Sequence, residues 1–335
     1  MTSILSPELV NGPFGDPTLF LDFRFERRAL LFDLGDLAAL APRKILRLSD
    51  VFVSHAHMDH FAGFDRLLRL CLGRETAVRL YGPSGFIERV EHKLAGYIWN
   101  LVQNYATDFT LVAHELDGEQ LRAARFRCHG RFRREPLPQR AAPQGVLLDE
   151  PGFRVRAAVL EHDVECLGFA FEEKVHVNVW KNRLLEMGLQ AGPWLNELKR
   201  AVAEDAPDDT PVLAHWRDDA GEHQRRHSLG ELKARVLRLV PGQKLCYVTD
   251  VVYGEHNARR IASLASGADV LFIECVFLQQ DAEHAARKFH LTARQAGLLA
   301  RAAGAKLVEP FHFSPRYTER EAELRAELEQ ARGGG

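Results

Sequence analysis

A string of histidines places the tightest constraint on how this chain can fold. Ser54-His55-Ala56-His57-Met58-Asp59-His60 holds three imidazoles and a carboxylate within six residues. The apolar segment Asp50 to Ser54 before it is typical of a strand. The segment after it has apolar side chains at the i, i+3, i+4 and i+7 positions of a helix, namely Phe64, Leu67, Leu68 and Cys71. The full H-x-H-x-D-H pattern at such a junction is far more specific than paired histidines, so a metal site is favoured over a solvated histidine-rich loop.

The geometry of this string suits two divalent metal ions. In an extended segment His55 and His57 project to one side, and the turn into the helix brings Asp59 and His60 round to a second, adjacent position. Two metals about 3.5–4 Å apart could then share a bridging hydroxide, which is the nucleophile that such clusters supply at neutral pH. The imidazole-rich set of donors favours zinc.

Further ligands for such a site should stand where strands end. Three candidates do: His162 follows the alternating strand at 153–160, Asp250 closes the strand at 245–249, and His312 follows the strand at 307–309. Taken singly, a histidine or aspartate at a strand end is more often a capping or loop residue. Taken together with the string at 55–60, the three complete two coordination shells, so we predict that they bind the metals.

The chain as a whole indicates the α/β class. Short apolar strands alternate with amphipathic helices over residues 18–160, starting with a hairpin of Thr18 to Phe25 and Ala29 to Asp33, and the rhythm resumes at 244. Between about 174 and 240 the regularity weakens, which indicates an inserted arm or lid. No tandem short repeat occurs, so we interpret the two α/β stretches as halves of one sandwich in a single domain, residues 1–335.

Two local predictions concern the segment after the metal string. A helix is expected from Pro83, with one apolar side formed by Phe86, Val90, Leu94, Ile98 and Leu101. Residues 131–145 are rich in arginine and proline, which predicts an exposed loop.

Composition narrows the functional classes. The 335 residues are 46% hydrophobic and 27% charged, which suits a large buried core. The net charge of −2 gives no global basic field, so any contact with RNA or DNA would have to be local. The five cysteines are scattered and lack CxxC pairing, which favours reduced thiols over disulfides or a thiolate zinc site. The N-terminus has no signal-peptide pattern and no apolar run reaches membrane-spanning length, so we expect a cytoplasmic protein without a membrane partner.

These motifs resemble the metallo-β-lactamase superfamily and, within it, the ribonuclease Z branch of endonucleases that trim 3′ trailers from precursor tRNA. Leu31-Phe32-Asp33-Leu34-Gly35 resembles the first motif of the family, the H-x-H-x-D-H string is its second, and Phe311-His312-Phe313-Ser314-Pro315-Arg316-Tyr317 resembles its closing motif. The resemblance implies an αββα sandwich of two mixed sheets flanked by helices. It also implies the ligand sets: one metal takes His55, His57, His162 and Asp250, and the other takes Asp59, His60, Asp250 and His312.

Two further matches separate ribonuclease Z from the lactamases proper. Glu274 in Phe272-Ile273-Glu274-Cys275 and His290 in Phe289-His290-Leu291-Thr292-Ala293 resemble a glutamate and a histidine of that branch. The resemblance implies a relay in which the two assist phosphodiester cleavage. The alternatives are a buried structural carboxylate for Glu274 and a residue beside the Thr292 helix cap for His290.

The arm and the assembly are also implied by the resemblance. Gly188 to Lys199, with Gly192-Pro193, resembles part of an RNA-gripping arm, although a plain surface helix that starts near a proline fits nearly as well. The family further implies a homodimer in which the arm of one subunit reaches the substrate of the other.

The chain departs from the family pattern at several positions. Asp36 begins a sequence that lacks the usual Glu-Gly-Thr-Gln continuation of the first motif, Met58 replaces a glycine, and Glu165 replaces a proline. The fourth motif has Thr249-Asp250-Val251 in place of Gly-Asp-Thr. All predicted ligands remain in place, so these changes bear on the substrate and not on hydrolysis.

The predicted activity is hydrolysis of a phosphodiester, with 3′ trailers of precursor tRNA as the first candidate substrate. Asp59 would orient the hydroxide, and His290, polarised by Glu274, would stabilise the phosphate or protonate the leaving oxygen. Two runs could grip phosphates or be solvated loops: Arg131, Arg133 and Arg134, and Arg225 and Arg226. One alternative is a hydrolase of a small phosphodiester such as a cyclic nucleotide. The other is a non-hydrolytic metal-binding or RNA-binding protein on the same fold. One form of this alternative, a di-iron redox protein, is disfavoured by the presence of His57.

Overall fold

The computed structural model describes residues 5–23, 26–218 and 221–334. The chain divides into two compact units. The first is Met1–Leu147, Arg156–Ala170 and Leu245–Gly335, and the second is Leu148–Val155 and Phe171–Lys244. In the described ranges, no helix combines the length and the apolar character needed to pass through a membrane.

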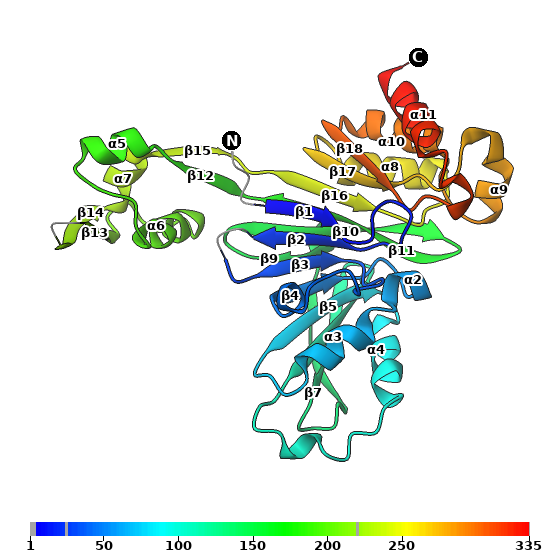
Figure 1. Ribbon diagram of the computed structural model, residues 1–335, viewed down its shortest axis with the longest axis horizontal. Helices are drawn as coiled ribbons and strands as arrows, with labels where there is room; N and C mark the ends of the chain where they lie inside the picture. The colour runs from blue at the N-terminus through cyan, green and yellow to red at the C-terminus, as the bar shows by residue number, and fades with distance from the viewer. Residues whose placement is uncertain (1–4, 24–25, 219–220, 335) are drawn as a thin grey trace. The chain divides into compact units, whose positions relative to one another are not determined.

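An eight-stranded mixed sheet lies in the first unit (Figure 1). In spatial order its strands are β1 (Leu5–Leu9), β2 (Leu19–Phe23), β3 (Ala29–Phe32), β4 (Leu48–Phe52), β5 (Ala77–Pro83), β6 (Thr110–Asp117), β7 (Gln120–Arg127) and β8 (Arg134–Ala141). Strands β3 to β6 are parallel, and the strands at both ends pair antiparallel. The predicted hairpin at 18–33 is present as β2 and β3, apart from residues 24 and 25, which lie outside the described residues.

The prediction of a loop over 131–145 was wrong, because β8 occupies Arg134–Ala141 at the edge of this sheet. The strand pairs with β7 and is largely exposed, as the arginine-rich sequence implied. Pro136 and Pro138 are compatible with a strand here because an edge strand pairs on one side only, so a missing N–H need not break the ladder.

Four helices follow strands of this sheet: α1 (Pro42–Ile45), α2 (Met58–Phe61), α3 (Phe64–Cys71) and α4 (Phe86–Ala95). Phe64, Leu67 and Leu68 of α3 are buried with Val51 and Val53 in one core, so the predicted stripe faces the sheet. The predicted extent of α4 was wrong. It ends at Ala95 with Gly96 as its cap, and the carbonyl of Leu94 accepts the indole N–H of Trp99 at 2.8 Å. Ile98 and Leu101, expected on its apolar side, are 88% and 61% exposed.

A six-stranded sheet has the order β18 (Leu307–Phe311), β17 (Val270–Glu274), β16 (Lys244–Val248), β11 (Val164–Glu173), β10 (Phe153–His162) and β9 (Val146–Asp149). Strands β16, β17 and β18 are parallel. Its helices are α8 (Glu255–Leu264), α9 (Ala282–Arg287), α10 (Ala293–Ala303) and α11 (Glu321–Gly333). The side chain of Thr292 caps α10 by accepting the backbone N–H of Gln295, and the side chain of Gln295 accepts the backbone N–H of Thr292. This reciprocal cap fixes the residue at which the helix begins.

Aromatic rings pack the two sheets of the first unit together. Phe32 on β3 and Phe52 on β4 stack with ring centroids 5.2 Å apart, and both contact Phe169 on β11. Phe32 also stacks on Tyr247 of β16. Strands β3 and β4 are therefore buried on both faces, by helices on one and by the other sheet on the opposite one. The predicted αββα sandwich with two mixed sheets is confirmed.

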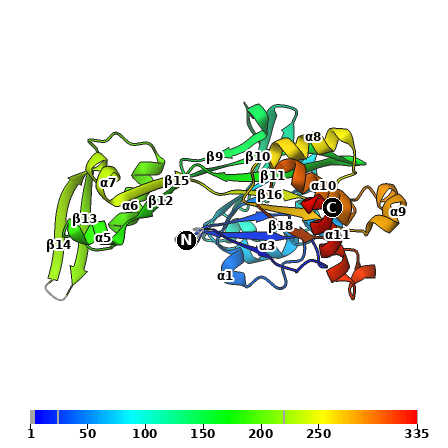
Figure 2. The ribbon, with the colours of Figure 1, turned by 90° about the horizontal axis from the view of Figure 1, so that it is seen from above.

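The second unit contains the segment 174–240 that was predicted as an arm or lid (Figure 2). Its elements are β12 (Val175–Val179) paired with β15 (Leu237–Pro241), the hairpin of β13 (Pro211–Asp218) and β14 (Gly221–Ser228), and the helices α5 (Lys181–Glu186), α6 (Trp194–Ala203) and α7 (Leu229–Val236). Trp194, Leu198 and Leu232 share a buried core. A single domain with an inserted arm or lid stays a prediction.

Candidate metal centre

Three overlapping groups of side chains bring possible metal-binding atoms within 4.8 Å of one another. The groups are His55, His57, His162 and Asp250; Asp59, His60 and His312; and Asp250, Glu274, His290 and His312. All nine residues predicted for the site therefore lie in one cluster. They meet because β4, β10, β16, β17 and β18 all end at this edge of the sandwich, as carboxyl ends of parallel strands do. Asp250 belongs to two of the groups, which is the position expected of a bridging ligand.

Two nitrogens in this cluster make no hydrogen bond. Nε2 of His55 and Nε2 of His60 are buried and have no hydrogen-bond partner within the described part of the chain, and oxygens of Asp250 lie 3.6 Å and 3.4 Å from them. Their Nδ1 atoms are engaged: that of His60 lies 2.8 Å from Asp33, and that of His55 lies 3.1 Å from the hydroxyl of Ser54. A buried ring nitrogen without a hydrogen bond costs free energy, and a histidine that ligates a metal commonly uses one nitrogen for the metal and the other for an outer partner. The donor set fits divalent metal ions.

His162 has the same arrangement. Its Nδ1 donates to the backbone carbonyl of Phe289 at 2.8 Å, which leaves Nε2 facing Asp250 at 3.1 Å. The carbonyl therefore selects the ring tautomer whose Nε2 carries a lone pair. His57 is exposed, at the N-cap of α2, with its ring 4.3 Å from that of His55.

Asp33 is a buried carboxylate to which the sequence assigned no role. One of its oxygens accepts the N–H of Ser54 at 2.6 Å, and the other accepts the hydroxyls of Ser54 at 3.0 Å and of Tyr247 at 2.9 Å. The second oxygen also holds His60, so Asp33 fixes the orientation of that imidazole. The first motif, Leu31 to Gly35, was the only sequence signal for it.

The imidazoles and carboxylates of the cluster shift one another's pKa values. Burial lowers the pKa of His60, but the carboxylates of Asp250 and Asp33 outweigh burial and raise it well above the ordinary value. Burial and the neighbouring His60 lower the pKa of His55 to about 2. Burial raises the pKa of Asp250, but His60 and His312 hold it well below the usual range. Cations that bind here must displace protons from imidazoles, so metal affinity should fall as pH falls.

Glu274 at the end of β17 is fully buried and accepts four hydrogen bonds. Oε2 accepts the N–H of Asp250 at 2.9 Å and that of the His290 ring, through Nδ1, at 3.0 Å. Oε1 accepts the N–H groups of Val251 at 3.2 Å and Leu291 at 2.8 Å. The carboxylate therefore joins the backbone of the predicted bridging residue to the ring of the predicted acid. Burial raises its pKa, but the charge and hydrogen bond of His290 lower it to about 2.

Comparisons with known proteins agree with this geometry. A family model described as a beta-lactamase superfamily domain matches residues 213–313. A ribonuclease Z of Deinococcus radiodurans is 33% identical over 333 residues, which covers 98% of this chain and 95% of that protein. The chain belongs to the ribonuclease Z family. Membership places it among the hydrolytic nucleases of the metallo-β-lactamase superfamily, whose members bind divalent metals.

Solved structures at lower identity share the fold of this ribonuclease Z family chain. The short form of human tRNase Z has a TM-score of 0.53 and 18% identity, and the alignment covers 93% of both chains. The metallo-beta-lactamase fold protein YhfI from Bacillus subtilis has a TM-score of 0.54 and 16% identity, covering 98% of this chain and 95% of that one.

The structure explains why departures from the ribonuclease Z pattern leave the site intact. Met58 is 84% exposed, and Asp36 and Glu165 are also exposed, so none of the three side chains occupies buried space in the cluster. Thr249 is buried, and its hydroxyl donates to Oδ1 of Asp250 at 2.9 Å. This substitution adds a hydrogen bond to the predicted bridging residue that a glycine could not make.

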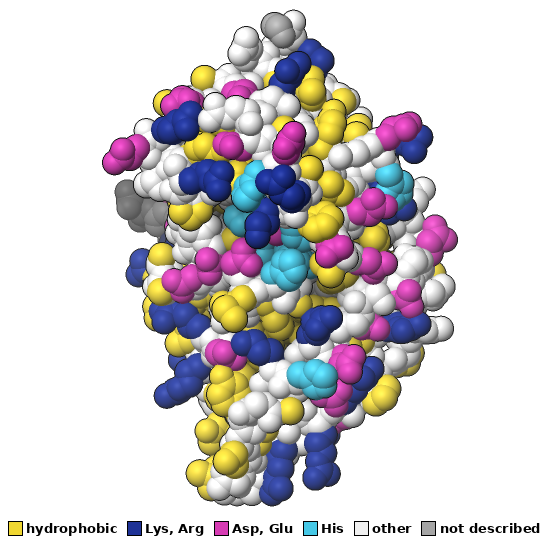
Figure 3. Space-filling view, turned by 90° about the vertical axis from the view of Figure 1, so that its right-hand side faces the viewer, with side chains coloured by type: hydrophobic (Ala, Val, Ile, Leu, Met, Phe, Trp, Pro, Cys, Tyr) yellow, Lys and Arg dark blue, Asp and Glu magenta, His cyan; other side chains and the backbone are white. Residues whose placement is uncertain are grey.

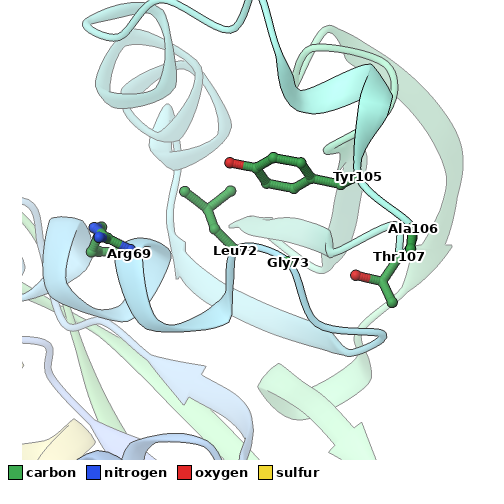
Figure 4. Close-up of a pocket in the computed structure, with 6 residues that line it drawn as sticks. All are labelled: Arg69, Leu72, Gly73, Tyr105, Ala106 and Thr107. Atoms are coloured by element: carbon green, nitrogen blue, oxygen red, sulfur yellow. The ribbon is translucent and has the colours of Figure 1, made fainter.

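A cavity of about 410 Å³ opens beside the cluster, and its lining includes Asp59, His290 and His312. Figure 3 shows histidine side chains in a hollow with lysine and arginine side chains around it. Another cavity, of about 490 Å³, is lined by Arg69, Leu72, Gly73, Tyr105, Ala106 and Thr107 (Figure 4). Because it includes none of the predicted site residues, we assign the chemistry to the first cavity.

Proposed function

We propose that this chain is a two-zinc endoribonuclease that removes 3′ trailers from precursor tRNA. The observation that carries the proposal is the convergence of seven predicted metal ligands beside a Glu274–His290 pair. The 33% identity to a protein named ribonuclease Z, over nearly the whole chain, supports it. The ligands are His55, His57, Asp59, His60, His162, Asp250 and His312.

Different residues around the cluster would carry out different parts of the reaction. Two divalent cations, when bound, supply a hydroxide nucleophile and neutralise charge on the phosphate. Asp59 orients the attacking oxygen. Glu274 holds Nδ1 of His290, so the proton available to a leaving 3′-oxygen is on Nε2. A leaving alkoxide is a strong base, so this proton should matter more for RNA than for an ester that leaves as a stable anion.

The second candidate is a phosphodiesterase acting on small substrates. The modest cavity and the net charge of −2 favour it, because a long RNA needs cationic contacts outside the site.

For the first candidate, such contacts could come from the second unit. Arg225 and Arg226 of the β13–β14 hairpin are exposed there, and we propose that they contact the phosphates of the RNA backbone.

One assay separates the two candidates. Zinc-loaded protein is incubated with a precursor tRNA carrying a 3′ trailer and, in parallel, with bis(p-nitrophenyl) phosphate. Cleavage at the base of the trailer supports the first candidate, and hydrolysis of the ester alone supports the second. Elemental analysis of the same preparation should give two zinc ions per chain, and one or none would contradict the two-metal site.

We further propose that the protein is a homodimer in the cytoplasm. Four apolar or aromatic side chains in the segment 97–105 are partly or largely exposed: Tyr97, Ile98, Leu101 and Tyr105, at 46%, 88%, 61% and 39%. Such a patch on the surface is typical of an interface, and the assembly implied by the family supplies a second copy as the occupant. The mass in solution by light scattering tests this: a monomer at all concentrations would contradict it.

A further inference from the structure

The cavity beside the metal cluster has a second wall that the metal ligands do not explain. Besides Asp59, His290 and His312, its lining includes Phe277, Lys288 and Arg316. Its volume of about 410 Å³ lies near the lower end of the range for small-molecule sites, about 300–1,000 Å³. A space of this size suits one nucleotide and not a duplex.

The cations on this wall are available to an anion. Lys288 follows α9, is exposed, and its ammonium makes no ion pair or hydrogen bond with other described residues. The guanidinium of Arg316 lies 5.5 Å from the centroid of the Phe277 ring, and its nearest carboxylate, Asp281, is 3.9 Å away. A guanidinium on an aromatic ring offers both charge and a flat surface, which is how unstacked RNA bases and their phosphates are often held.

The position of His290 indicates which nucleotide of the substrate would enter the cavity. In the proposed reaction the oxygen of water bonds to phosphorus, the bond from phosphorus to the 3′-oxygen breaks, and the Nε2 proton of His290 passes to that oxygen. The proton lost by water goes to solvent, from which His290 is reprotonated. The products are a 3′-hydroxyl and a 5′-phosphate. Because His290 lines the cavity, the nucleotide that carries the leaving oxygen must lie at or in it.

We propose that this cavity binds the nucleotide on the 5′ side of the cleaved bond, with its own 5′-phosphate on Lys288 and Arg316. Asp16, which also lines the cavity and is not among the proposed metal ligands, disfavours a phosphate beside it, so the cationic wall is the favoured place for the 5′-phosphate. This inference rests on the proposed function, which it deepens by giving the site a nucleotide subsite.

The test compares Lys288→Ala with Arg287→Ala. Both changes remove one exposed positive charge from adjacent positions at the end of α9, and only Lys288 lines the cavity. For a short single-stranded RNA, Lys288→Ala should raise KM several-fold with kcat little changed. It should also reduce the slope of log KM against log salt by about 0.7, the value for one phosphate contact on a single strand. Arg287→Ala should change neither quantity.

A binding measurement without turnover completes the test. Adenosine 5′-monophosphate should compete with the RNA, adenosine should compete at least tenfold less well, and Lys288→Ala should remove most of the difference. Equal effects of the two variants, or equal competition by the two ligands, would overturn the subsite. Failure of the proposed function looks different, because the wild-type protein would then hydrolyse bis(p-nitrophenyl) phosphate and leave every RNA uncut.

Discussion

The two halves of the candidate site are built in different ways. The first half comes from one junction between β4 and α2, and consists of His55, His57, Asp59 and His60. The second half comes from five separate segments, and consists of His162, Asp250, Glu274, His290 and His312. Local backbone geometry brings the first set together, whereas the second depends on strands and loops that meet only in the folded chain.

Each half is held by one buried carboxylate, and the two carboxylates make different sets of contacts. Asp33 contacts the ring of one ligand, His60, together with the hydroxyl of Tyr247 and both the hydroxyl and the backbone N–H of Ser54. Glu274 contacts the backbone of Asp250 as well as the ring of His290. Asp250 has a φ of 49°, in the left-handed region, and such a conformation persists only where its surroundings hold it. Loss of Asp33 should release the His60 ring and one backbone N–H, whereas loss of Glu274 should release the His290 ring and three backbone N–H groups.

The largest effect is expected where the halves meet. Asp250→Ala should abolish activity, reduce bound metal and lower the melting temperature, because the imidazoles and cations of both halves lose their shared anion. Metal content by elemental analysis and thermal unfolding measure this, with Asp117→Ala at a surface ion pair as the control. Full metal content and an unchanged melting temperature would show that the halves do not share Asp250.

The next effect tests whether His290 of the Glu274–His290 pair protonates the leaving oxygen. His290→Ala should lower kcat on RNA by about 10²–10⁴, the range for positioned acid–base groups, with metal content unchanged. The loss on bis(p-nitrophenyl) phosphate should be much smaller, because nitrophenolate leaves without a proton. Equal losses on both substrates would assign His290 to phosphate binding or to structure.

Glu274→Gln sharpens the same comparison. This change should reduce kcat as His290→Ala does. It should also weaken metal binding, because an NH₂ group would replace one carboxylate oxygen of Glu274 and would face backbone N–H donors. Chelator competition measures the metal affinity. If the affinity of Glu274→Gln equals that of His290→Ala, then Glu274 acts only through the histidine.

A smaller effect is expected in the first half. Asp33→Asn should weaken metal affinity by about 10–100-fold, the usual cost of losing the outer partner of a ligating histidine. Activity should return at saturating zinc, because the β4–α2 junction still places the ligands. Activity that stays low at saturating zinc would mean that the first half needs its buried carboxylate as much as the second half does.

The smallest effect tests a group outside both halves. Burial lowers the pKa of His114 on β6 to about 4, from an ordinary value of 6.5. As pH falls, the unfolded chain takes up this proton first, so the stabilisation is complete above pH 6.5 and is lost between pH 6.5 and 4. The difference between the folded and unfolded pKa values links the stability to pH. Urea unfolding of wild type and His114→Gln should show stabilities whose difference changes across this window, and a constant difference would contradict it.

The sequence predicted the elements whose signals are local. The strand, string and helix from Asp50 to Cys71 form as expected, because hydrophobic periodicity and backbone geometry act over a few residues. Strand ends taken together with the string at 55–60 predicted His162, Asp250 and His312, and the structure brings the three into one cluster, since parallel strands direct their carboxyl ends to one edge. The resemblance to ribonuclease Z then supplied the fold and the pairing of ligands with metals.

Tertiary structure alone decided the supporting contacts and the limits of some elements. Asp33 accepts a hydrogen bond from Tyr247, 214 positions away, and no periodicity in the sequence could announce that pair. The apolar spacing continued past Ala95, but the cap at Gly96 ended α4 and left Ile98 in solvent. The arginine-rich segment at 134–141 became an edge strand because β7 offered it a partner. The contact between Asp33 and Tyr247 joins groups that are distant in sequence, so its free energy depends on the fold. The end of α4 and the pairing of β8 use partners that are near in sequence, but the propensity pattern alone does not select them.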